Sequence, residues 1–179
     1  MKGLLFGLAL ALLAPAGLAA EKARDADSHF FQPGFRDLPE ELKLARAEGK
    51  RGLAIMFEAE DCPPCKRMKR DILSQPRVQD YYRKHFRVLS IDFNGDQEVI
   101  DPAGRSLAEK TYAGKGGVAI RGTPSFLFLD LQGKEMTRHY GEIRSVEDFL
   151  LLGKFVVSDA WRSGDFRTYR AQNARARPQ

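Results

Sequence analysis

Two residues of this chain, Cys62 and Cys65, have the type and spacing that disulfide chemistry requires. They are its only cysteines, and Pro63 and Pro64 separate them. In disulfide exchange the attacking species is a thiolate, and a second thiol close by can resolve the mixed disulfide that forms. We therefore interpret the pair as a redox-active dithiol in which Cys62 attacks and Cys65 resolves.

The residues around the pair predict how it is positioned. Residues 53–57 form a short apolar run, which is typical of a strand buried on both faces of a sheet. Helical spacing follows over residues 62–74, so Cys62 falls at the N-cap, where helix N–H groups and the helix dipole stabilise a thiolate. Because Pro63 and Pro64 lack an N–H, we expect the N–H of Cys65 to be the first donor to the Cys62 sulfur.

The rest of the chain supplies the elements that must hold this strand and helix. Helices are predicted at residues 39–48, 76–84 and 106–112, and another begins after Ser145 as N-cap. Strands are predicted at residues 86–92, 125–130 and 135–140, the last two as a hairpin. The order βαβ, connecting helix, hairpin and helix predicts an α/β fold with a central mixed sheet and helices on both faces.

Several other uses of a cysteine pair compete with this interpretation. A zinc site needs four ligands, and the remaining candidates, His29, His85 and His139, are scattered. A structural disulfide would close too small a loop to stabilise the fold much. Haem attachment is excluded because Lys66, and not histidine, follows the second cysteine. A dithiol that handles copper(I) remains an alternative, and no other metal site is expected.

The ends and the composition suggest an exported protein of one domain. Residues 1–20 combine Lys2, an apolar run and small residues at cleavage spacing, which predicts a signal peptide removed after Ala19 or Ala20. The mature protein is then not embedded in the membrane. Residues 21–38 are expected to form an irregular lead-in that packs onto the core, and residues 163–179 a frayed basic tail. The net charge of +5 is not gathered into a basic patch, so no nucleic-acid partner is expected.

The motifs together resemble the thioredoxin superfamily. The resemblance rests on the strand, the Cys62–Cys65 helix and Gly122-Thr123-Pro124 before the next core strand; it covers most of residues 39–160 and implies a thioredoxin-like domain at 39–162. More narrowly, the segment 56–65 with Arg121-Gly122-Thr123-Pro124 looks like the periplasmic SoxW-like thioredoxin-related proteins. This resemblance implies that Pro124 is a cis-proline and that Thr123 and Pro124 hold an extended substrate segment.

Two positions depart from cytoplasmic thioredoxins, which carry a buried aspartate and a tryptophan where this chain has Met56 and Asp61. Glu58, two residues after Met56, either replaces the missing carboxylate in proton transfer or is a solvated carboxylate at the end of a strand. Asp61 should oppose a Cys62 thiolate, whereas Lys66 should favour it.

The sequence thus predicts a thiol–disulfide oxidoreductase of the periplasm that needs no cofactor, because its electrons reside in the cysteines. The leading hypothesis is a reductase of protein disulfides, recharged by a membrane thiol donor because the periplasm is kept oxidising. A disulfide oxidase or isomerase is the alternative of the same class.

Overall fold

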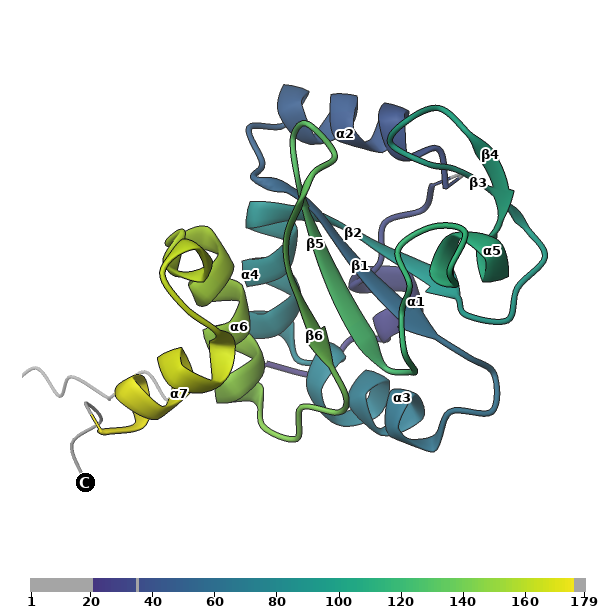
Figure 1. Cartoon of the computed structure of the whole chain (residues 1–179). Helices are drawn as coiled ribbons and strands as arrows, with labels where there is room; N and C mark the ends of the chain where they lie inside the picture. The colour runs from purple at the N-terminus through teal and green to yellow at the C-terminus, as the bar shows by residue number, and fades with distance from the viewer. Residues whose placement is uncertain (1–20, 35, 176–179) are drawn as a thin grey trace, which may run out of the picture.

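A four-stranded sheet in the order β2-β1-β5-β6 forms the centre of the chain (Figure 1). Its strands are β1 (Gly52–Glu58), β2 (Phe86–Asp92), β5 (Ser125–Asp130) and β6 (Glu135–Tyr140). β1 runs parallel to β2 and antiparallel to β5, which pairs antiparallel with β6. The computed structural model describes residues 21–34 and 36–175, so the predicted signal peptide at residues 1–20 lies outside the described residues.

Helices cover both faces of this sheet because its central strand is apolar on both sides. Successive side chains of a strand point to opposite faces. Ala54 and Met56 of β1 therefore pack with one set of helices, and Leu53, Ile55 and Phe57 pack with the other. The first set is α3 (Pro63–Met68), α4 (Pro76–His85) and α6 (Val146–Val157); the second is α2 (Leu38–Ala47) and α5 (Glu109–Ala113). The predicted α/β architecture is confirmed.

The helix that carries the cysteine pair is shorter than predicted. Residues 62–74 were expected to form one helix, but α3 ends at Met68 and a π-helical turn, Lys69–Leu73, completes the segment. The buried side chains Met68, Ile72 and Leu73 still face the core, because apolar spacing constrains which face is buried more tightly than it constrains the hydrogen-bond pattern.

The lead-in packs onto the core as predicted, but it is not wholly irregular. It contains a short helix, α1 (Ala26–His29), whose N-cap Asp25 accepts a hydrogen bond from the N–H of Ser28. Phe30 and Phe31 are buried, and the ring of Phe30 lies 5.6 Å from that of Tyr82. These contacts make the lead-in part of the folded domain.

The connecting region differs from the prediction. A helix was expected over residues 106–112, but β4 (Ser106–Ala108) pairs with β3 (Glu98–Ile100), and α5 begins only at Glu109. Val99 and Leu107 are opposite each other in this small sheet and pack against the core. This packing outweighs the helical tendency of the segment.

The C-terminal end is more ordered than predicted. Ser145 caps α6 by accepting a hydrogen bond from Asp148 N, as expected. After a 3-10 turn, Ala160–Arg162, the predicted frayed tail forms α7 (Phe166–Arg175). Its rings Phe166 and Tyr169, nearly one turn apart, lie 5.7 and 5.2 Å from the ring of Phe155 and hold the helix on α6. Residues 176–179 lie outside the described part.

Candidate active site

The cysteine pair lies at the start of α3, shortly after the end of β1. Cys62 and Cys65 are joined by a disulfide bond, and both side chains are buried, with 4% and 1% of their surface exposed. Cys62 is the N-cap of α3, and its sulfur accepts a hydrogen bond from Cys65 N at 3.2 Å. Pro63 and Pro64 occupy the first two helical positions. The expected first donor to the Cys62 sulfur, Cys65 N, is confirmed.

The segment before β5 is the second part of the site. The Thr123–Pro124 peptide bond is cis, as the resemblance implied. Gly141 N donates to the carbonyl oxygen of Pro124 at 2.9 Å, and Ser125 Oγ donates to the carbonyl oxygen of Gly122 at 2.6 Å. Among the described residues, none is hydrogen-bonded to the backbone N–H or C=O of Thr123. That peptide is therefore available to an extended partner.

The sheet brings these two parts to the same edge. β1 and β5 are antiparallel, and Phe57 at the end of β1 is opposite Ser125 at the start of β5. Figure 1 shows α3 beside the start of β5. The two cysteines also share a hydrophobic cluster with Phe126.

Glu58 lies at the end of β1 and is not a free, solvated carboxylate. Its side chain is 18% exposed, it accepts a hydrogen bond from Ser90 Oγ, and Lys69 Nζ lies 2.6 Å from its Oε2. Lys69 also pairs with Asp27 at 2.7 Å. Burial lowers the pKa of Lys69, but its hydrogen bonds to Asp27 and Glu58 more than offset this, so the pKa is raised overall and the ammonium stays charged.

A pocket of about 310 Å³ connects Glu58 to the dithiol. Glu58, Cys65, Lys66 and Lys69 are among its lining residues. The other charged site candidate, Asp61, is exposed and has no ion pair within the described residues, and Lys66 likewise has none. Met56, which stands where cytoplasmic thioredoxins carry a buried aspartate, is fully buried in the core. Glu58 thus shares a pocket with Cys65, together with two further carboxylates, Glu60 and Asp92.

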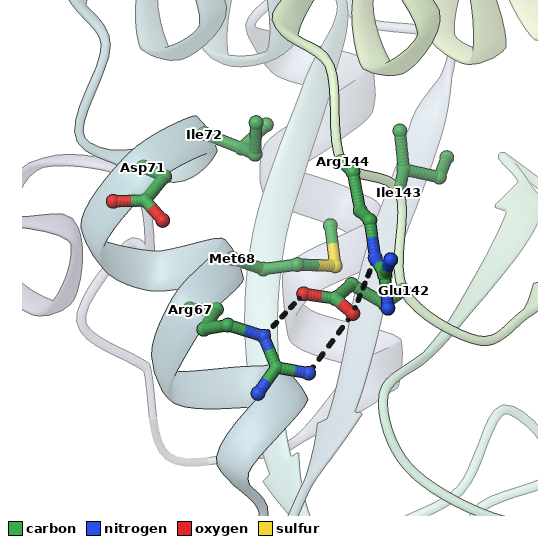
Figure 2. Close-up of a pocket in the computed structure, with 7 residues that line it drawn as sticks. All are labelled: Arg67, Met68, Asp71, Ile72, Glu142, Ile143 and Arg144. Atoms are coloured by element: carbon green, nitrogen blue, oxygen red, sulfur yellow. Dashed lines mark hydrogen bonds and ion pairs between the residues drawn. The ribbon is translucent and has the colours of Figure 1, made fainter.

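Sequence reasoning missed a charged group that ties α3 to the loop after β6. Glu142 accepts two hydrogen bonds from Arg67, from Nε at 2.8 Å and from Nη2 at 3.0 Å, and one from Arg144 Nε at 3.0 Å. Figure 2 shows the two guanidinium groups converging on this carboxylate, in a pocket that Met68 also lines. The pocket around them, of about 390 Å³, is also lined by Asp71, Ile72 and Ile143. Arg67 and Glu142 are 75 residues apart, and no local pattern links them.

Comparisons with known proteins agree with this geometry. A model of the Thioredoxin-like domain family matches residues 38–156, more than half of the chain, and the chain belongs to this family. No curated protein sequence matches it significantly. The family and the disulfide-linked pair define the class of protein: a thioredoxin-like thiol–disulfide oxidoreductase.

Solved structures place the chain among the same relatives. A thioredoxin from Thermus thermophilus is 30% identical, with a TM-score of 0.50 over 68% of this chain and 84% of that one. A proposed disulphide-isomerase from Bacteroides thetaiotaomicron is 28% identical, with a TM-score of 0.53 over 71% and 91% of the two chains. A thioredoxin-fold protein from Helicobacter pylori shares the fold at 18% identity, with a TM-score of 0.61 over 83% and 94%.

The Arg67–Glu142 pair makes a testable electrostatic prediction. The two hydrogen bonds from Arg67, more than the one from Arg144, lower the pKa of Glu142 from 4.5 to about 2. Because this folded-state pKa is depressed, the stabilisation it provides is present above about pH 4.5 and is lost as the pH falls towards 2. Arg67→Gln should move the pKa of Glu142 back towards 4.5, as measured by NMR titration of its carboxyl carbon.

Arg144→Gln is the matched control. Arg144 is 82% exposed and makes one hydrogen bond to Glu142, so its removal should raise that pKa less than removal of Arg67 does. An unchanged Glu142 titration in Arg67→Gln would show that this pair does not exist in solution.

Proposed function

We propose that this chain is an exported reductase of protein disulfides that works in the periplasm, as the SoxW-like resemblance suggests. The observation that carries the proposal is the Cys62–Cys65 disulfide at the start of α3, at the same sheet edge as the cis Thr123–Pro124 bond. Thr123 and Pro124 would hold an extended segment of the substrate by backbone pairing.

The reaction exchanges one disulfide for another. The Cys62 thiolate attacks one sulfur of the substrate disulfide, a mixed disulfide forms, and the first substrate thiolate leaves. Cys65 loses its proton and attacks the Cys62 sulfur, which releases the second substrate thiolate. Two electrons pass from the dithiol to the substrate, and the Cys62–Cys65 disulfide seen in the structure is the oxidised product.

The charges around Cys62 favour a reductant over an oxidant. Strongly oxidising dithiols owe their potential to a stabilised reduced form, in which the thiolate is strongly favoured. Here the prolines leave Cys65 N as the donor to the Cys62 sulfur, and the neighbouring Asp61 carboxylate disfavours a thiolate. Of the two basic residues on α3, Arg67 is bound to Glu142, and only the exposed Lys66 favours the thiolate. The reduced form therefore gains little extra stabilisation, so the pair gives up its electrons readily.

Reduction of the Cys62–Cys65 disulfide back to the dithiol requires a thiol donor, because the periplasm is kept oxidising. We propose a membrane protein in this role, with signal-peptide cleavage after Ala19 or Ala20 releasing the chain outside the cytoplasm. N-terminal sequencing of the exported protein tests the cleavage. No helix of the described residues is both long and apolar enough to cross a membrane.

Cysteine variants test the reaction. Cys62→Ser should reduce insulin with dithiothreitol no faster than dithiothreitol alone, because the attacking sulfur is gone. Cys65→Ser should form a mixed disulfide with insulin that persists on a non-reducing gel, because the resolving thiol is absent. Insulin reduction by Cys62→Ser at the wild-type rate would contradict the assignment of the attacking residue.

We further propose that Glu58 accepts the proton of Cys65 through water in the pocket they share. Glu58→Gln should slow release of the substrate from the mixed disulfide at pH 7 by on the order of 100-fold, at the low end for general acid–base catalysis. Single-turnover release measured against pH separates this from a structural role, since only loss of the base changes the pH profile.

Glu60→Gln is the matched control, because Glu60 lines the same pocket but has no ion pair among the described residues. It should leave the profile unchanged. The same pH profile in Glu58→Gln and the wild type would exclude Glu58 as the base and leave it a structural ion-pair partner of Lys69.

A further inference from the structure

A third pocket lies at the open end of the β5–β6 hairpin. It has a volume of about 370 Å³ and is lined by residues 121–125 with Tyr140 and Gly141. The lining thus includes Thr123, whose backbone N–H and C=O have no hydrogen-bond partner among the described residues. It also includes two large side chains, Arg121 and Tyr140. A substrate segment that pairs with Thr123 would pass directly over this pocket.

Tyr140 forms a fixed aromatic surface in the pocket. It is the large apolar side chain that stands out as exposed in the described part of the chain, at 39%. Its hydroxyl accepts a hydrogen bond from Arg138 Nη1 at 3.1 Å, and the same guanidinium nitrogen donates to the carbonyl oxygen of Val118 at 2.7 Å. The ring is therefore held in place from its far end.

Arg121 lies over this ring and keeps its charge unneutralised. Its guanidinium carbon is 6.0 Å from the centre of the Tyr140 ring, and the side chain is exposed. No carboxylate of the described residues forms an ion pair with it, whereas Arg67 and Arg144 in the neighbouring pocket are both paired with Glu142. An arginine placed in this way offers a planar set of donors that matches a carboxylate.

We propose that Arg121, supported by Tyr140, binds an acidic side chain of the substrate, so that the preferred substrates are protein disulfides with Asp or Glu near the reacting cysteine. This proposal rests on the proposed function and names its substrate class. Residues 122–124 form a bend, and both Arg121 and Thr123 line this pocket. A substrate segment paired with Thr123 therefore brings side chains within a few residues of its reacting cysteine into reach of Arg121.

Asp61 restricts the position of this acidic residue further. It is exposed, adjoins Cys62 and has no ion pair in the described part of the chain. A substrate carboxylate directly beside the reacting cysteine would be repelled by it. Charge preference should therefore depend on position as well as sign.

Peptide disulfides test the proposal. Three otherwise identical peptides carry Glu, Gln or Lys at both positions that lie two residues from the disulfide cysteine, one before it and one after it. The dithiol form of the full mature chain reduces each peptide in a stopped-flow experiment. The wild type should prefer Glu to Lys by about two- to fivefold, as expected for an exposed ion pair, and 1 M salt should remove most of the preference.

Variants of Arg121 test whether this side chain causes the preference for the Glu peptide over the Lys peptide. Arg121→Gln should bring the Glu and Lys peptides to equal rates, and Arg121→Glu should reverse their order, while both variants reduce neutral hydroxyethyl disulfide at the wild-type rate. Lys134→Gln is the control, because it removes one positive charge at the other end of the same hairpin, where Gly133 N bonds to Asp130. It should keep the wild-type preference.

Two outcomes overturn the proposal, and they are distinguishable. Equal rates for the three peptides in the wild type, or a preference that Arg121→Gln retains, would dismiss the role of Arg121 and leave the reductase intact. Failure of the wild type to reduce hydroxyethyl disulfide as well as every peptide would refute the proposed function and this inference with it.

Discussion

The antiparallel pairing of β1 with β5 is the constraint on which the site depends. Because Phe57 is opposite Ser125, the end of one strand and the start of the other meet at one edge of the sheet. The first strand leads into the dithiol helix, and the other begins directly after the cis Thr123–Pro124 bond. A slip of one residue would turn every buried side chain of β1 to the opposite face, so the two packed helix layers enforce the register that assembles the site.

The chemistry of the dithiol is set by which donors and charges reach Cys62. A helix N-terminus normally offers several N–H groups to a thiolate, but the two prolines reduce that number, and Cys65 N is the donor observed. Two basic residues of this segment are paired elsewhere, Lys69 with Glu58 and Asp27, and Arg67 with Glu142, whereas Lys66 has no ion pair among the described residues. The redox potential of a cysteine pair at the start of a helix therefore depends on which ion pairs the neighbouring charged residues form.

The features that sequence reasoning predicted are those encoded locally. The apolar run before Cys62, the prolines after it and Ser145 before α6 each act within a few residues, and the strands, the caps and the donor to the Cys62 sulfur followed from them. The cis bond at Pro124 was implied by the family resemblance and not by spacing.

What sequence reasoning missed depends on contacts between distant segments. Glu142 meets Arg67 across 75 residues, and the strands β3 and β4 are too short for a periodic signal. The helix α7 did carry a signal, since Phe166 and Tyr169 are at helical spacing, but the basic composition of the tail suggested a frayed end. Glu58 was identified as a candidate, yet no local pattern links it to its partner Lys69, which lies in the π-helical turn.

The redox potential of the Cys62–Cys65 pair tests the central claim most directly. Equilibration of the mature protein in glutathione buffers, with the dithiol fraction counted by alkylation, gives this value. We expect a potential near the reducing end of the known range for such pairs, about −270 mV. A potential near about −120 mV, typical of a strong oxidant, would contradict it.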